Sequence, residues 1–171
     1  MKIAATNDSH YAYEMGRIAG VEAAAIGCNW SFAPIVDINR NWRNPIISIR
    51  TFCDDPDQTL ELAVQYMKGI RESGIAPAAK HFPGDGIDEF DQHLSFSVLS
   101  YDVEEWMDTF GKVYKGLIDH DLPSLMAGHI SFPAWVRKVK PDATTQEAIL
   151  PATVNKYIMT DLLRDELGFN G

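Results

Sequence analysis

The feature that most constrains the fold of this chain is the repeated succession of an apolar run, a polar loop and an amphipathic helix. Three apolar runs are predicted to be strands: Ser31–Ile38, Ile75–His81 and Leu122–Ile130. Their bodies are apolar throughout, as expected for strands that are covered on both faces. Strand, loop and helix recur about every 45 residues, which favours βα units around a parallel sheet.

Four amphipathic helices are predicted around these strands. They cover Asp8–Ile26, Asp55–Gly74, Ser100–Ile118 and Thr153–Leu167. The second begins at a strong start signal, because Asp55 can cap it, Pro56 suits its first turn, and Gln58 lies three residues after the cap. Ser100 is expected to cap the third helix.

Right-handed crossovers would bring the polar ends of the three strands to one rim of the sheet. These ends are Asp37, Lys80 with His81, and His129. A (β/α)₈ barrel has this arrangement and typically needs about 250 residues, whereas the chain has 171. We therefore expect an α/β fold that is a partial (β/α)₈ TIM barrel.

Composition narrows the classes of function. The net charge of −9 and a pI near 4.9 argue against a nucleic-acid binder, which would carry a basic face, and against a membrane-surface protein. No apolar run approaches the roughly 20 residues that span a bilayer, and no leader follows Met1, so we expect a cytoplasmic protein. The spacing of the cysteines and histidines predicts no metal site, and no cofactor is expected.

A cluster of titratable residues follows the second predicted strand. It reads Lys80-His81-Phe82-Pro83-Gly84-Asp85-Gly86, and then Asp91-Gln92-His93. Such residues on a loop at a strand end are typical of a catalytic site. Asp91 and His93 are placed for a dyad in which a carboxylate holds one ring nitrogen of a general acid/base. Alternatively, Lys80 and His81 form a satisfied structural pair, and Asp91 and His93 are ordinary loop residues.

The cluster resembles the signature of family 3 glycoside hydrolases, in particular the β-N-acetylglucosaminidase (β-N-acetylhexosaminidase) branch. There the pattern runs Lys-His-Phe/Pro-Pro-Gly-His-Gly and then Asp-Ser/Thr-His, so this chain departs from it at Asp85 and Gln92. The resemblance covers nearly the whole chain. Its other parts are Phe32–Asp37, Asn44–Phe52, Leu125–Ile130 and Leu162–Gly171.

The resemblance implies a retaining mechanism on glycans that contain N-acetylglucosamine. It makes His93 the acid/base and Asp91 the residue that orients it. It also implies that Arg50, Lys80 and His81 bind sugar hydroxyls.

His129 and Asp37 are expected either to line the pocket or to support it, and Asp85 is assigned no role. The resemblance also places the nucleophilic aspartate beyond Gly171. Residues 1–171 would then be part of one barrel domain, truncated at both ends. Such a chain is expected to be inactive and unstable without the remainder of its own barrel.

Other readings stay open. The same fold supports a β-glucosidase or a glycoside phosphorylase, since a histidine acid/base would not repel a phosphate anion. A non-catalytic carbohydrate-binding fragment is a third reading. Among the tryptophans, Trp106 is expected in the core, whereas Trp30, Trp42 and Trp135 are expected to be more open and able to stack on a sugar.

Overall fold

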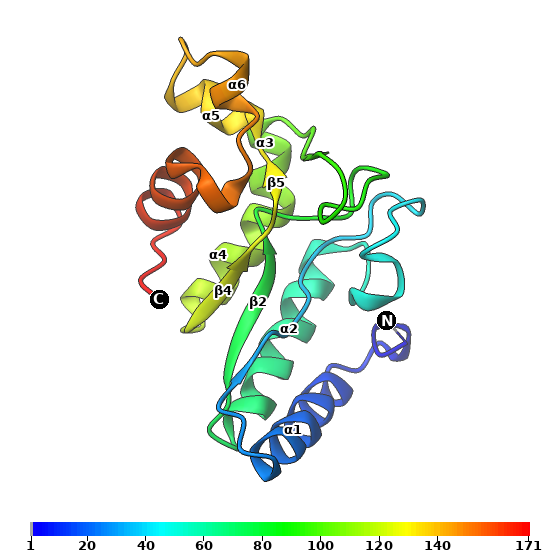
Figure 1. The fold of residues 1–171 in the computed structure, drawn as a ribbon. Coiled ribbons are helices and arrows are strands. Elements are labelled where there is room, and N and C mark those ends of the chain that lie inside the picture. Colours follow the sequence, from blue (N-terminus) through cyan, green and yellow to red (C-terminus); the bar gives the residue numbers. More distant parts are fainter. Residues whose placement is uncertain (1) are drawn as a thin grey trace.

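A computed structural model describes residues 2–171 as a parallel sheet with helices packed against it (Figure 1). The strands are β1 (Trp30–Ser31), β2 (Ala76–Phe82) and β4 (Ser124–Ala127), in the spatial order β1-β2-β4. A second parallel pair is formed by β3 (Ser97–Val98) and β5 (Ile130–Ser131). All pairings between these strands are parallel, so the α/β fold predicted from the sequence is confirmed.

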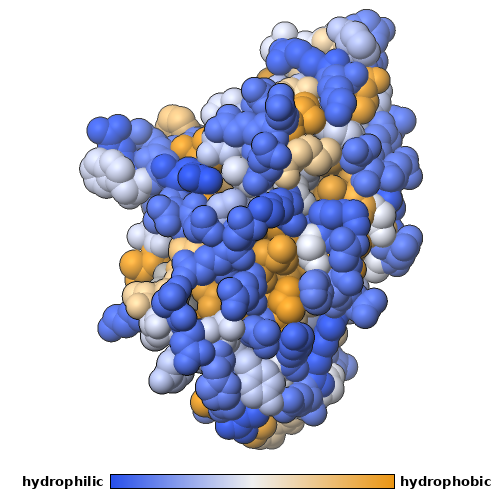
Figure 2. All heavy atoms as spheres, turned by 180° about the vertical axis from the view of Figure 1, so that it is seen from behind, coloured by the Kyte–Doolittle hydropathy of each residue, from blue (hydrophilic) through white to orange (hydrophobic). Residues whose placement is uncertain are grey.

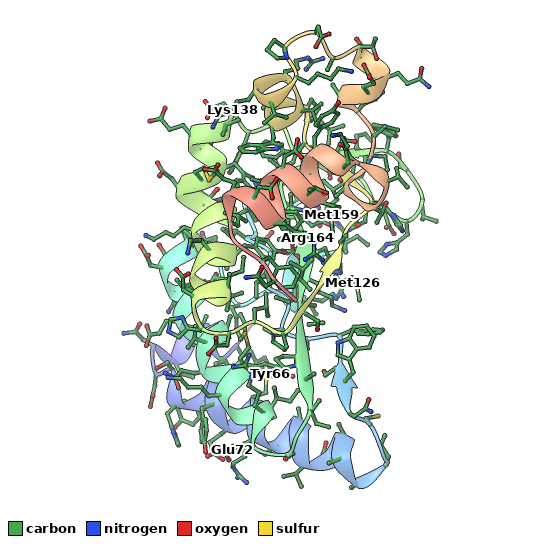
Figure 3. The ribbon with its side chains drawn as sticks, turned by 90° about the vertical axis from the view of Figure 1, so that its left-hand side faces the viewer. Tyr66, Glu72, Met126, Lys138, Met159 and Arg164 are labelled. Carbon is green, nitrogen blue, oxygen red and sulfur yellow. The ribbon has the colours of Figure 1, made fainter. Side chains whose placement is uncertain are left out.

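The helices lie between the strands along the chain. They are α1 (His10–Ala25), α2 (Pro56–Arg71), α3 (Val103–Trp106), α4 (Lys112–Asp119), α5 (Pro133–Val139) and α6 (Thr145–Ala148). Two π-helical stretches are Met107–Gly111, which joins α3 to α4, and Tyr157–Glu166; short 3₁₀ turns are Ala4–Thr6, Ser48–Arg50 and Ala152–Val154. In Figure 3, α2 and α4 cover one face of the sheet, and Met126 of β4 lies on the side away from them. Successive βα units of this kind are part of a (β/α)₈ barrel.

The start of α2 follows the sequence signal, and the start of α3 does not. Asp55 accepts a hydrogen bond from the backbone N–H of Gln58 at 2.7 Å, with Pro56 in the first turn. The prediction that Ser100 caps the third helix is wrong. Asp102 is the cap, because its extended backbone lets the carboxylate accept from the N–H of Glu105 at 2.8 Å.

The predicted strand Ser31–Ile38 is wrong in extent. Regular pairing covers only β1, and Ile35 adds one isolated bridge to Lys80. Pro34 interrupts the ladder because proline has no N–H to donate.

The predicted strand Leu122–Ile130 divides into β4 and β5. At the break, the N–H of Gly128 bonds to Phe82 at 2.7 Å, whereas the N–H of His129 bonds to the side chain of Gln92.

The C-terminal quarter holds helices that the sequence did not predict. Both α5 and α6 lie where no helix was expected, and the predicted helix Thr153–Leu167 is a 3₁₀ turn followed by a π-helix. Trp135 was expected to be more open, yet it is 2% exposed and its indole N–H donates to the backbone oxygen of Tyr157 at 2.8 Å. This tryptophan therefore joins α5 to the last helix.

The core under β2 is aromatic. The ring of Phe82 meets the rings of Trp106 and Tyr114 edge to face, with centroids 6.3 and 5.0 Å apart. All three side chains are fully buried, as expected for Trp106. The indole N–H of Trp106 also donates to the backbone oxygen of Pro83 at 2.9 Å. The loop that follows β2 is thus tied to the core at its first residue.

In residues 2–171, no helix has the length and apolarity needed to cross a membrane. The cytoplasmic location expected from the sequence stays a prediction.

Apolar side chains remain exposed along α1 and at the sheet edge. They are Tyr11, Ile18, Val21, Ile26, Trp30 and Phe32. Figure 2 shows apolar patches among hydrophilic side chains on one face of the molecule. Several large apolar side chains exposed on neighbouring elements favour association with another surface.

We expect the isolated 171-residue chain to self-associate, because exposed apolar side chains and an unpaired β1 edge favour intermolecular contact. Sedimentation velocity at several concentrations checks this. An Ile18→Lys/Val21→Lys variant should shift the distribution toward monomer, with Glu22→Lys as a charge control. A monodisperse wild-type monomer with a cooperative melt would contradict the expectation.

Candidate active site

The fully buried carboxylate of Asp37 joins the segment that follows β1 to the end of β2. It accepts from the backbone N–H of His81 at 3.1 and 3.2 Å, and its Oδ2 lies 2.7 Å from His81 Nδ1. It also accepts from the N–H of Asp85 at 2.8 Å. Because a carboxylate only accepts, we assign the proton to Nδ1 of His81, which makes Nε2 a hydrogen-bond acceptor.

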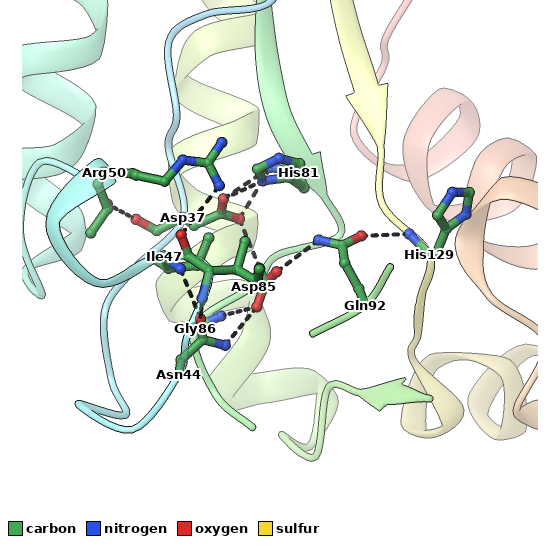
Figure 4. Close-up of polar contacts among 11 residues, drawn as sticks. Asp37, Asn44, Ile47, Arg50, His81, Asp85, Gly86, Gln92 and His129 are labelled. Atoms are coloured by element: carbon green, nitrogen blue, oxygen red, sulfur yellow. Dashed lines mark hydrogen bonds and ion pairs between the residues drawn. The ribbon is translucent and has the colours of Figure 1, made fainter. Parts of the chain in front are cut away.

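Lys80 and Arg50 bring positive charge to the same rim. Burial is the main cause that lowers the pKa of Lys80, the charge of Arg50 adds to it, and the charge of Asp37 opposes it. Arg50 donates to the backbone oxygen of Ile46 at 3.2 Å and extends past Asp37 toward His81 (Figure 4). Three of the predicted substrate-binding residues, Arg50, Lys80 and His81, therefore lie together.

Asp91 and His93 form a hydrogen-bonded pair on the irregular loop after β2. Asp91 Oδ1 lies 2.7 Å from His93 Nδ1 and accepts from the backbone N–H of His93 at 2.8 Å. These two bonds, the backbone one first, hold the pKa of Asp91 below its usual value. The side chains of His93 and Asp91 are 57% and 25% exposed. The expected contact is present, with Nε2 of the imidazole free to exchange a proton with a ligand.

His129 lies farther from the other predicted residues. Its ring Nδ1 is 3.1 Å from Thr153 Oγ1, and its backbone N–H donates to Gln92 Oε1 at 2.7 Å. In Figure 4, Gln92 stands between His129 and the group around His81. This geometry favours a supporting position for His129 over a place in the group around His81.

Sequence reasoning missed a buried polar network beneath these residues. Asp85 accepts from Asn44 Nδ2 at 2.9 Å, from the N–H of Gly86 at 2.6 Å and from Gln92 Nε2 at 2.7 Å. Burial is the main cause that raises the pKa of Asp85, followed by the charge of Asp37. A signal was present in the sequence, since Asp85 and Gln92 are the two positions that depart from the resembling pattern.

Within residues 2–171, no group of three or more histidine, cysteine, aspartate or glutamate residues is arranged to hold a metal ion.

The chain matches known proteins along its whole length. The family model described as "Glycosyl hydrolase family 3 N terminal domain" matches residues 1–171. A protein of Cellulomonas fimi named beta-N-acetylglucosaminidase/beta-glucosidase is 45% identical over 171 residues, which are 100% of this chain and 30% of that protein. A beta-hexosaminidase of Nitrosospira multiformis is 33% identical over 95% of this chain and 43% of its own length.

Solved structures are also similar to this chain over nearly its whole length. The beta-glucoside phosphorylase BglX bound to 2FGlc has a TM-score of 0.96 and 41% identity over 99% of this chain and 30% of its own. A family 3 beta-N-acetylglucosaminidase from Paenibacillus sp. str. FPU-7 has a TM-score of 0.90 and 32% identity over 100% and 31%. The chain thus spans less than half the length of each of these relatives.

We expect Asp37→Asn to destabilise the full-length protein by about 2 kcal/mol, because a neutral amide loses the charge-assisted bonds to its donors and forces His81 into the tautomer in which Nδ1 accepts. The midpoint of urea unfolding, compared with wild type, measures this. Asp119→Asn, on the exposed end of α4, is the matched control and should change stability by less than about 0.5 kcal/mol. An Asp37→Asn midpoint equal to that of the control would refute the central place of this carboxylate.

Proposed function

Because the chain belongs to glycosyl hydrolase family 3, we propose that it carries the acid/base part of a retaining β-N-acetylhexosaminidase. The observation that supports this most is the hydrogen-bonded pair of Asp91 and His93, exposed on a loop at the rim of the parallel sheet. A titratable imidazole held by a carboxylate in a solvent-facing position meets the requirements of a general acid/base.

In the proposed reaction, His93 gives the proton on Nε2 to the glycosidic oxygen as the bond to the anomeric carbon breaks. A nucleophilic aspartate, expected beyond Gly171, attacks that carbon and forms a glycosyl-enzyme intermediate. His93 then takes a proton from water, and the water oxygen displaces the aspartate. Asp91 holds Nδ1 throughout and stabilises the protonated ring.

Arg50, Lys80 and His81 are the proposed binding groups for the hydroxyls of the sugar that is cleaved. Their position on one rim supports this, since cationic donors and an imidazole acceptor can anchor the hydroxyls of a sugar ring and tighten in the transition state. Asp37 orients His81 from below. The remainder of the barrel, as a structural partner, would complete the sugar-binding pocket.

N-acetylglucosamine glycosides are the proposed substrates. The names of the relatives support this, because hexosaminidase or acetylglucosaminidase occurs in both curated names and in one of the two structures cited above.

A glycoside phosphorylase is the second candidate. The structure of a beta-glucoside phosphorylase is 41% identical with a TM-score of 0.96. In addition, the proposed acid/base is an imidazole, which would not repel an incoming phosphate as a carboxylate would. Arg50 and Lys80 add positive charge on the same rim.

We expect the full-length enzyme to release nitrophenol from aryl N-acetyl-β-glucosaminide with a higher kcat/KM than from aryl β-glucoside. Running each assay with and without inorganic phosphate, and identifying the sugar product, separates hydrolysis from phosphorolysis. Free N-acetylglucosamine supports the hydrolase, and a sugar 1-phosphate supports the second candidate. Absence of turnover on both substrates in both buffers would overturn both proposals.

We expect His93→Ala to lower kcat/KM by about 10²–10⁴-fold on a substrate with a poor leaving group, because such a leaving group needs the proton. On a dinitrophenyl glycoside the loss should be small, since this leaving group departs without a proton. His120→Ala, an exposed histidine on the far end of α4, is the matched control. Equal losses on both substrates would rule out His93 as the acid.

A further inference from the structure

Gln92 is turned the opposite way from the two residues beside it. It is 5% exposed, whereas the side chains of Asp91 and His93 are 25% and 57% exposed. The three residues lie on a loop without regular structure, where alternation along a strand does not impose such directions. A long polar side chain buried under a solvent-facing pair needs partners for both ends of its amide.

Both ends of that amide are used. Nε2 donates to Asp85 Oδ2 at 2.7 Å, and Oε1 accepts from the backbone N–H of His129 at 2.7 Å. The fit is close, because a Cβ added at Gly128 would lie 2.9 Å from Oε1. A shorter amide could not reach both partners, and a carboxylate would face Asp85 with like charge.

Asp85 is itself held by the segment that follows β1 and by its own loop. Its N–H donates to Asp37, and Oδ1 accepts from Asn44 and from the N–H of Gly86. Through Asp85 and Gln92, the dyad is therefore connected to the segments that follow β1, β2 and β4 (Figure 4).

Among the described residues, the other hydrogen bonds and ion pairs of this loop connect neither Asp91 nor His93 to a residue outside the loop. Asp88 accepts from Ser97 Oγ and from the N–H of Val98, and Glu89 pairs with Arg43 at 2.9 Å. Asp91 accepts, through its backbone oxygen, from residues 94 and 95 of its own loop. Within residues 2–171, Gln92 makes the hydrogen bonds that join 91–93 to Asp85 and to His129.

We propose that Asp85 and Gln92 are a positioning pair, whose hydrogen bond holds the Asp91–His93 dyad where His93 can protonate the glycosidic oxygen. This rests on the proposed function, since it takes His93 as the acid. Both side chains of the pair are buried, at 2% and 5% exposed, so they are placed to act through the dyad rather than on the substrate. The effect of the pair is to restrict a loop that would otherwise sample positions too distant for proton transfer, and a displacement of about 1 Å can cost on the order of 10²-fold in rate.

The chemistry of the pair provides a reciprocal test. In Asp85→Asn, the NH2 of the new amide faces the NH2 of Gln92. Turning the Gln92 amide restores this hydrogen bond but sets its NH2 against the N–H of His129. Turning the new amide instead sets its NH2 against the donors of Asn44 and Gly86. In Gln92→Glu, two carboxylates face each other.

The double variant exchanges the two groups, so that the amide introduced at position 85 can donate to the carboxylate introduced at position 92. The other oxygen of that carboxylate accepts from His129, and the oxygen of the amide still accepts from Asn44 and Gly86. The double variant also keeps the wild-type net charge.

In the full-length enzyme, we expect each single variant to lower kcat/KM by about 10–10²-fold for a poor leaving group and by much less for a dinitrophenyl glycoside. The double variant should recover to within a few fold of wild type. Thermal melts and kcat/KM on both substrates are measured for each protein. Asp142→Asn with Gln146→Glu, an exposed pair near α6, is the matched control and should leave both substrates unaffected.

Losses that are equal on the two substrates, or that multiply in the double variant, would overturn the positioning role. If a charged single variant does not fold, Gln92→Asn replaces it, because it keeps the amide but cannot span both partners; it should show the same dependence on leaving group. His93→Ala separates the two proposals. If the loss in His93→Ala does not depend on the leaving group, His93 is not the acid and the proposed function is contradicted. If the loss depends on the leaving group in His93→Ala but not in the Asp85 and Gln92 variants, only the positioning role is contradicted.

Discussion

The buried carboxylate of Asp37 is the interaction on which the rest of the site depends. An ionised group without partners would be costly to bury, but here two backbone N–H groups and an imidazole offset the lost hydration. Those donors belong to the end of β2 and to the loop that follows it. The same bonds therefore hold the segment after β1 against the end of β2, orient His81 and place Asp85. A change that weakens them is expected to lower the stability of the rim and to alter its geometry at the same time.

The site combines a buried aromatic cluster with a loop that is open to solvent. Below lie Phe82, Trp106 and Tyr114, a fully buried aromatic group that supports the end of β2. Above it, the dyad projects from an irregular loop and is open to solvent. A catalytic group on such a loop can reach a ligand, but it loses the positional restraint that a strand provides. The buried hydrogen bonds of Gln92 restore part of this restraint without burying the imidazole.

Local signals in the sequence were reliable where neighbouring residues decide the structure. The Asp55 cap is an interaction within four residues, and the contact between Asp91 and His93 spans two. Strand limits were not reliable, because Pro34 breaks the ladder and the N–H of His129 is taken by a side chain 37 residues away. Burial of Trp135 likewise depends on the last helix, which a local pattern does not encode. The catalytic and binding roles assigned to the site residues stay predictions.

By itself, the sequence determined the order of the βα units, the family and the residues that make up the polar rim. These follow from periodicity, caps and motifs, which are local properties of the chain. Only the tertiary structure decided that Asp85 and Gln92 are partners and that His129 contributes its backbone rather than its ring to them. Hydrogen bonds between loops depend on the distance and direction between strand ends, and these arise only when the sheet has packed.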